Sequence, residues 1–169
     1  MTISYTYMEA IGRAYPGVQC QCFGDPSVYE NIVYQGGDPL PTIEELNTWI
    51  AAQIKEDMWL KIKDERDRRK TELGYKVGNY WYHSDTYSRT QQLGLVMIGA
   101  NLPQNIMWKT MSGEFVLMTP TLAGQIFQAA IASDMTIHSI AEQKRQAMLV
   151  SADPGSFDWA SGWPKGYGE

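Results

Sequence analysis

The residues that could carry out acid–base chemistry gather at His83, Ser84 and Asp85, where an imidazole, a hydroxyl and a carboxylate follow one another. Three such groups in contact could activate a nucleophile, as they do in serine hydrolases. Neighbouring residues of a strand point to opposite faces, so His83 and Ser84 would not share a site. The sequence therefore favours a hydrogen-bonded histidine at the end of a strand over a catalytic group.

Metal binding would draw on the only cysteines and histidines in the chain, Cys20, Cys22, His83 and His138. In a strand, the spacing of the cysteines puts both side chains on one face, where an unstrained disulfide is difficult, so we expect them to stay reduced. A zinc site would need all four side chains from distant segments. We therefore expect no metal and no cofactor, and we interpret His138 as a structural residue of a helix.

Two further patterns lack the features that catalysis or phosphate binding needs. The acidic pairs Glu44-Glu45 and Asp64-Glu65 lie in predicted helices, where they cap or solvate the helix. Gly36-Gly37 lacks the third glycine and the Lys-Ser/Thr ending of a phosphate loop. A glycosidase would need two carboxylates about 5–10 Å apart in a cleft, and no pair stands out. The sequence thus predicts a protein that is not an enzyme.

The composition fits a soluble globular protein with a binding role. The formal charge of −5 argues against DNA or RNA as a partner, because that binding depends on clustered Lys and Arg. No apolar run approaches the roughly 18 residues of a membrane span, and the start of the sequence lacks the features of a secretion signal, so we expect residence in the cytoplasm. Six Trp, ten Tyr and four Phe make up 12% of the residues, and such side chains dominate contact surfaces.

A long helix is predicted to follow the Gly/Pro-rich linker of residues 36–41. Thr42 is its N-cap, Glu45 completes a capping box, and no helix breaker follows before Gly74. A helix of about thirty residues is long for this chain, so we expect it to project or to pack against a copy of itself in a homo-oligomer. Its apolar face is expected to contain Leu46, Trp49, Ile50, Ile54, Met58 and Ile62, which recur at spacings of three and four.

The second half of this helix is highly charged. Residues 63–70 are Lys-Asp-Glu-Arg-Asp-Arg-Arg-Lys. Such a run usually forms a solvated helix face with i,i+4 ion pairs. The alternative is a site for an anion or an acidic partner, and on that basis Arg66, Arg68 and Arg69 are candidate partner-binding residues.

Two β-hairpins are predicted after the long helix, at residues 75–83 and 106–118. The first has a Gly-Asn turn and the second a Ser-Gly turn, each between residues that favour strands. Each hairpin runs into a helix start with a capping residue. We expect both hairpins in one sheet, covered by the helices of residues 86–100 and 120–150. The fold class is therefore α+β, in the order long helix, hairpin, helix, hairpin, long helix.

The first of the two covering helices contains Gly94 and Gly99. Each glycine costs about 1 kcal/mol relative to alanine inside a helix, so the pair either permits a close helix contact or ends the helix early. The apolar residues available for burial in this helix are Tyr87, Leu95 and Ile98. Those of the second covering helix are Leu122, Ile126, Ala130, Ile137, Ala141 and Met148.

Smaller parts are expected on either side of this α+β domain, which spans residues 41–150. Residues 1–40 are predicted to form a β-rich unit with strands at 18–23 and 29–34. Residues 151–169 form an extended tail rich in glycine and proline. Its four aromatic side chains would be costly to leave in water, so they either fold back on their own domain or dock on another chain. These candidate partner-binding residues are Phe157, Trp159, Trp163 and Tyr167.

Three segments of the domain resemble a family of tailed-bacteriophage proteins. They are the Arg66-Asp67-Arg68-Arg69 run, residues 81–89 (Trp-Tyr-His-Ser-Asp-Thr-Tyr-Ser-Arg) and residues 108–119 (Trp-Lys-Thr-Met-Ser-Gly-Glu-Phe-Val-Leu-Met-Thr). Members of that family are often encoded beside tail-fibre genes and are commonly labelled tail-fibre assembly chaperones. The resemblance covers roughly residues 59–150, and the aromatic tail after Val150 lies outside its pattern.

The resemblance implies a tail-fibre accessory protein that binds a fibre or tail polypeptide in the host cytoplasm during assembly. It would assist folding, trimerisation or attachment of the fibre by covering apolar surface that otherwise aggregates. The alternative is a permanent component of the virion tail, such as a fibre-to-baseplate adaptor or a receptor-binding tip. The family offers no catalytic residues to transfer. We expect the partner contact on the aromatic tail first, and on the three arginines second.

Overall fold

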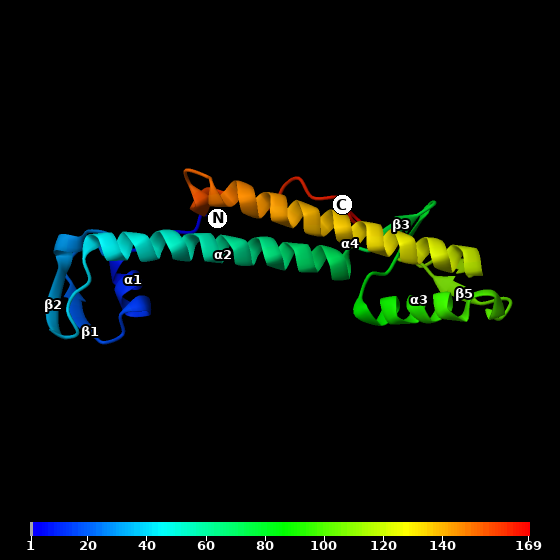
Figure 1. Ribbon diagram of the computed structural model, residues 1–169, viewed down its shortest axis with the longest axis horizontal. Helices are drawn as coiled ribbons and strands as arrows, with labels where there is room; N and C mark the ends of the chain where they lie inside the picture. Colours follow the sequence, from blue (N-terminus) through cyan, green and yellow to red (C-terminus); the bar gives the residue numbers. More distant parts are fainter. Residues whose placement is uncertain (1) are drawn as a thin grey trace. The chain divides into compact units, whose positions relative to one another are not determined.

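The computed structural model describes residues 2–169 and has the predicted α+β class (Figure 1). Within these residues, four α-helices alternate with three antiparallel β-hairpins. The order long helix, hairpin, helix, hairpin, long helix is confirmed. The elements are α1 (Tyr7–Ala14), β1 (Val18–Cys22), β2 (Ile32–Gly37), α2 (Ile43–Glu72), β3 (Tyr75–Val77), β4 (Tyr80–Tyr82), α3 (Thr86–Ile98), β5 (Met107–Lys109), β6 (Phe115–Leu117) and α4 (Pro120–Leu149).

The chain divides into two compact units, and α2 and α4 contribute to both. The first unit comprises Met1–Lys61 and Gln146–Trp159, and the second comprises Ile62–Arg145 and Ala160–Glu169. The expected organisation into residues 1–40, 41–150 and 151–169 stays a prediction. None of the helices in the described part of the chain is both long and apolar enough to cross a membrane.

The first unit begins with α1 and the β1–β2 hairpin. Thr6 caps α1 and forms a capping box with Glu9. The strand predicted at residues 29–34 begins later than expected. Residues 29–31 form a 3-10 turn, and β2 starts at Ile32. The sequence interpretation of Gly36-Gly37 as linker is also wrong, since both glycines pair with β1. The core of this part consists of Ala10, Ile11, Ile32 and Leu46.

The predicted long helix is confirmed as α2, with 30 residues. Its start is the capping box: the Thr42 hydroxyl accepts the backbone N–H of Glu45 at 3.2 Å, and the Glu45 carboxylate accepts the N–H of Thr42 at 2.7 Å. Along its apolar face, Leu46, Met58 and Ile62 are fully buried, whereas Ile50 and Ile54 are only half-buried.

Both hairpins of the second unit lie where the sequence predicts them. In the first, Tyr75 pairs with Tyr82, and in the second, Met107 pairs with Leu117. The prediction that they share one sheet is wrong, because each is a separate two-stranded sheet. One backbone hydrogen bond of 2.9 Å, from Met111 N–H to the Trp81 carbonyl, links the two hairpins.

The helix α3 is shorter than predicted and turns a different face inward. It ends at Ile98 because Gly99 follows with φ = 56°, a conformation that glycine adopts without strain. Tyr87 was expected to be available for burial, but its side chain is 74% exposed. Gln92 lies on the buried face instead, where Tyr75 donates a hydrogen bond to it.

The core of the second unit lies between the hairpins and α4. Its buried residues include Tyr75 and Tyr82 from the first hairpin, and Leu95 of α3 packs against it. The predicted face of α4 is confirmed by the burial of Ile126, Ala130, Ile137, Ala141 and Met148, with Leu122 half-buried. The hairpins and α3 are thereby held on one side of α4, and the outward faces of α3 and the second hairpin remain exposed.

Candidate partner-binding surfaces

The residues that could have formed a catalytic triad have separate structural roles. Ser84 is buried, and its hydroxyl accepts the backbone N–H of Gly74 at 3.0 Å. Asp85 caps α3 by accepting the N–H of Ser88 at 2.9 Å. The Ser88 hydroxyl also donates to Asp85 and lowers the pKa of that carboxyl group. Ser84 is thus turned toward the backbone rather than toward the imidazole of His83.

The cysteines and histidines lie in unrelated places. Cys20 and Cys22 are free thiols, and burial raises the pKa of Cys20. The Nε2 atom of His138 lies 3.1 Å from the Nζ atom of Lys70 on the exposed surface of the second unit. Among residues 2–169, no three His, Cys, Asp or Glu side chains are placed to hold a metal ion.

A polar cluster at the end of α2 closes on the C-terminal tail, and we call it the C-terminal clasp. Glu65 and Arg69 follow Ile62 at helical spacing, so they continue the apolar face of α2 into the second unit. Arg69 is consequently only 8% exposed, although it belongs to the charged run. The clasp consists of Glu65, Arg68, Arg69, Trp163, Pro164 and Glu169.

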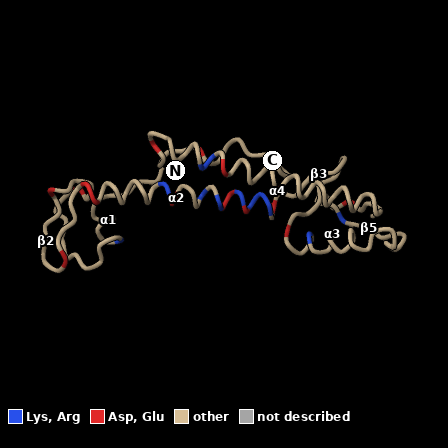
Figure 2. The backbone as a smooth tube through the Cα atoms, viewed as in Figure 1, with Lys and Arg blue, Asp and Glu red and all other residues tan. Residues whose placement is uncertain are grey.

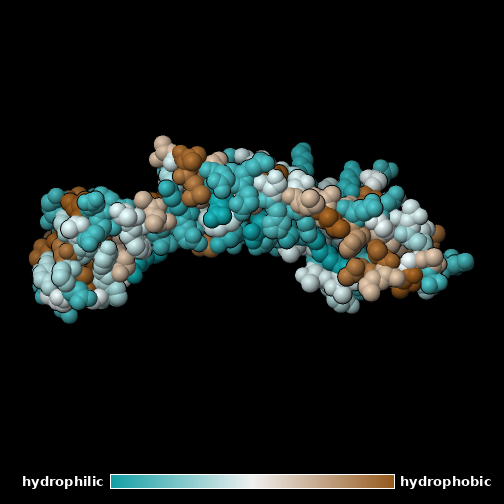
Figure 3. Space-filling view, in the orientation of Figure 1, coloured by the Kyte–Doolittle hydropathy of each residue, from teal (hydrophilic) through white to brown (hydrophobic). Residues whose placement is uncertain are grey.

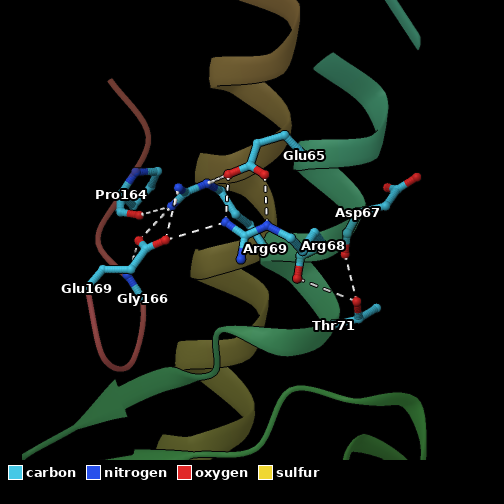
Figure 4. A network of polar contacts seen from close by, with 8 residues as sticks. All are labelled: Glu65, Asp67, Arg68, Arg69, Thr71, Pro164, Gly166 and Glu169. Carbon is cyan, nitrogen blue, oxygen red and sulfur yellow. Dashed lines mark hydrogen bonds and ion pairs between the residues drawn. The ribbon is translucent and has the colours of Figure 1, made fainter. Parts of the chain in front are cut away.

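Arg69 is the centre of the clasp (Figure 4). Its guanidinium donates to Glu65 at 2.6 Å, to the Pro164 carbonyl at 2.6 Å and to Glu169 at 3.1 and 3.2 Å. Arg68 makes a bidentate pair with Glu65, with both N–O distances 2.8 Å. Charge-assisted bonds of this kind are the strongest hydrogen bonds in proteins, so the clasp fixes residues 164–169 to α2.

The backbone of the tail fits closely against the end of α2. The Tyr167 N–H donates to the Leu73 carbonyl at 2.9 Å. A side chain at Gly166 would overlap Leu73, so glycine is required for this approach. The Gly166 N–H also donates to the Glu169 carboxylate at 3.1 Å, which turns the glutamate back toward Arg69.

The clasp keeps both of its carboxylates charged. Hydrogen bonds from Arg68, and secondarily from Arg69, hold the pKa of Glu65 below its ordinary value despite its burial. The pKa of Glu169 is lowered by the Gly166 N–H and by Arg69. Pairing with Glu65 raises the pKa of Arg68.

Two of the four aromatic residues predicted to bind a partner lie in this region. The Trp163 ring is 5.7 Å from the Arg69 guanidinium and 5.6 Å from the Lys144 amine. Tyr167 contacts Trp81 edge to face, with ring centroids 6.2 Å apart. These contacts correspond to the alternative in which the tail folds back on its own domain, and a partner that uses these side chains would first have to open the clasp.

The other predicted partner-binding residues are placed differently. Phe157 and Trp159 are half-buried and belong to the first unit. Arg66 forms an ion pair of 2.8 Å with Asp67, whose side chain is mostly exposed. Figure 2 shows the alternation of acidic and basic residues along this part of α2. Partner binding by any of these residues stays a prediction.

A second region, which the sequence interpretation did not identify, lies between α3 and α4. Arg89 of α3 donates to the Asp134 carboxylate of α4 at 2.7 and 2.9 Å, and to the carbonyls of Ser84 at 2.6 Å and Lys70 at 2.9 Å. Burial alone would lower the pKa of Arg89, but the hydrogen bond and charge of Asp134 outweigh it and raise the pKa. The Tyr75 ring is 5.7 Å from the Arg89 guanidinium. Burial raises the pKa of the Tyr75 hydroxyl to about 12.

Beside this ion pair the two helices enclose a pocket of about 360 Å³, which we call the α3–α4 groove. Its lining is partly apolar and partly polar, and it includes the charged residues Arg89 and Asp134. Large apolar side chains of the same two helices extend into water: Met97 is 79% and Met135 is 69% exposed. Figure 3 shows hydrophobic surface over the part of the molecule where Figure 1 labels α3 and the adjoining part of α4. The lining includes Thr90, Leu93, Phe127, Ala130 and Ile131.

A third region is the outward face of the β5–β6 hairpin. Side chains alternate along a strand, and Trp108 and Val116 point inward to the core. Met107, Phe115 and Leu117 therefore point outward together with Lys109, and the three apolar side chains are each at least half exposed, with Phe115 at 61%. An apolar face on a two-stranded hairpin with unpaired edges can accept another polypeptide chain.

The family model described as "Domain of unknown function (DUF4376)" matches residues 53–161, which include the clasp residues of α2, the α3–α4 groove and the β5–β6 hairpin. No curated protein and no solved structure matches the chain.

Proposed function

This chain belongs to the DUF4376 family, and we propose that it is a phage tail-fibre accessory protein that binds a fibre or tail polypeptide and assists its folding or attachment. The proposal starts from the resemblance of residues 81–89 and 108–119 to such proteins. It involves no catalytic step. Its setting is the host cytoplasm during assembly.

The observation that carries the proposal is the outward face of the β5–β6 hairpin. Met107, Phe115 and Leu117 form a small apolar surface that the described chain does not cover. Aromatic residues and methionine, here Phe115 and Met107, are enriched at the core of protein interfaces. Covering the apolar surface of an incompletely assembled fibre would keep that surface from aggregating.

Co-expression with the fibre or tail polypeptide encoded beside the chain tests the proposal. We expect the fibre to be soluble in the presence of this protein and largely insoluble without it. Phe115→Asp and Leu117→Asp should abolish the effect, whereas Val150→Asp, at an exposed apolar position in the first unit, should not. A fibre whose solubility and binding are independent of this protein would refute the proposal.

Mass spectrometry of purified particles separates the two forms of the proposal. A chaperone that acts only during assembly should be absent from the particles. A fibre-to-baseplate adaptor or a receptor-binding tip should be present at a fixed ratio to the fibre.

A further inference from the structure

The outward face of α3 has the arrangement of a helix-packing surface. By helical periodicity, Thr90 and Gly94 lie along the middle of this face. Larger apolar side chains flank them, with Leu93, which lines the α3–α4 groove, and Met97 on one side. Tyr87 and Ile98 lie on the opposite side. Small residues between large ones allow the backbone of a second helix to approach closely.

Gly94 has no other explanation within the chain. It lies inside α3, where glycine is less favourable than alanine. A side chain added there would meet nothing within 4 Å, so no neighbour in the same chain requires a glycine. Gly99, in contrast, is explained by its positive φ at the end of the helix. Gly94 therefore leaves open space on this face, where a second helix from outside the chain can approach closely.

The charges of this face suit a second copy of the same chain. With a formal charge of −5, two copies repel each other over most surfaces. Arg89 is the only charged residue of α3, and it is paired with Asp134. Two copies can thus bring this face together around a two-fold axis without placing like charges opposite each other.

The apolar area also agrees with what a dimer needs. Six large apolar side chains of α3 and the adjoining part of α4 are exposed, and their average exposure is more than half. They are Tyr87, Leu93, Met97, Ile98, Ile131 and Met135. At roughly 200 Å² for each fully exposed side chain, they present on the order of 700 Å². Specific interfaces bury about 800 Å² from each partner.

We infer that two copies of this chain associate through the outward face of α3, with α3 of each copy packed against α3 and the α3–α4 groove of the other. This interface is separate from the β5–β6 face, so it does not depend on the proposed function. It also differs from an oligomer formed through α2.

Light scattering and sedimentation of the full chain at about 1–100 µM test the inference. We expect a mass twice the 19.1 kDa of one chain at the higher concentrations. Met97→Glu and Gly94→Leu should raise the dissociation constant at least about tenfold, which is 1.4 kcal/mol. Met97→Leu should preserve the dimer, and so should Val150→Glu, which places the same charge at an exposed apolar position in the first unit.

Gly94→Ala gives the clearest test, because it should raise the stability of α3 and weaken the association of two copies. Alanine should raise the thermal stability of the helix, since its side chain meets only open space within the chain. The same methyl group should weaken association if a second helix packs at Gly94. A single 19.1 kDa species at every concentration would overturn the inference. A dimer unchanged by both Met97→Glu and Gly94→Leu would overturn it too, by placing the interface elsewhere.

Discussion

The C-terminal clasp and the α3 face, both in the second unit, use opposite chemistry. The clasp is centred on ion pairs, and the chain covers it with its own tail, leaving Arg69 8% exposed. The α3 face has no charge except the paired Arg89, and large side chains such as Met97 remain in water. The clasp also contains Trp163, whereas the α3 face presents Met97 together with Tyr87.

This difference shows why charge and aromatic content in the sequence did not indicate the open surface. Buried ion pairs need well-placed partners, which the clasp obtains from Glu65 and Glu169. An exposed apolar face is recognised by its lack of charged side chains, and no sequence motif corresponds to such a lack. The region most noticeable in the sequence is therefore the one that the chain closes on itself.

Removal of Arg69 should have the largest effect on stability. Arg69→Ala leaves Glu65, whose side chain is 10% exposed, without one of its two guanidinium partners, and it leaves Glu169 with only a longer pair of 3.4 Å to Arg68 and the Gly166 N–H. Breaking a buried pair from one side typically costs about 3–5 kcal/mol, and urea unfolding of the full chain measures the loss. Arg66→Ala removes a pair with Asp67, whose side chain is 57% exposed, and leaves no buried charge without a partner, so its cost should be smaller, at about 1 kcal/mol. Equal losses in the two variants would contradict the structural role of the clasp.

The elements of the fold could be predicted from the sequence because their signals are local. Thr42 with Glu45 marks the start of α2, and the Gly-Asn and Ser-Gly turns mark the two hairpins. Whether two hairpins join into one sheet depends on contacts between distant residues, and that prediction was wrong. The burial of Tyr87 was wrong for a related reason, since α3 has more than one apolar face and packing chooses between them.

The two candidate regions could be predicted only in part. The charged run was interpreted as a solvated face, although the spacing of Ile62, Glu65 and Arg69 is the signal that places two charges inward. Arg69 has one partner nearby, Glu65, but Glu169 is 100 residues away and no local pattern connects them. The groove depends on how α3 packs against α4, and Arg89 and Asp134 are likewise far apart in the sequence.

A smaller disturbance of the clasp is expected from a single methyl group. Gly166→Ala places a side chain against Leu73 and should push the tail away from α2 while leaving the Glu65–Arg69 pair in place. Overpacking of this kind costs about 1–3 kcal/mol. Hydrogen exchange of the Tyr167 amide, which donates to the Leu73 carbonyl, should become faster. Gly12→Ala in α1, where a side chain meets nothing within 4 Å, is the matched control, and an equal effect there would argue against a tight fit.

Acid should loosen the clasp without a direct effect on the α3 face. The pKa values of Glu65 and Glu169 lie below their ordinary value of 4.5 in the folded protein. The folded clasp therefore binds fewer protons than the unfolded chain, so its stabilisation is complete above about pH 4.5 and is lost as the pH falls through the lowered pKa values. Protection of the Tyr167 amide should decrease over that range. In Glu169→Gln, the loss of Tyr167 protection that arises from protonation of Glu169 should disappear. An unchanged dependence of this protection on pH would mean that other groups cause it.

The smallest effect on folding is expected at the centre of the open region. Met97 is 79% exposed, and methionine and glutamate both favour helices, so Met97→Glu removes little buried area and little helix propensity. Its unfolding free energy, measured where the protein is monomeric, should change by less than about 0.5 kcal/mol. Arg69→Ala should then destabilise the fold and Met97→Glu should alter only association. A loss of 2 kcal/mol or more in Met97→Glu, on the order of a buried-core substitution, would mean that this side chain supports its own domain and that the α3 face is not an open surface.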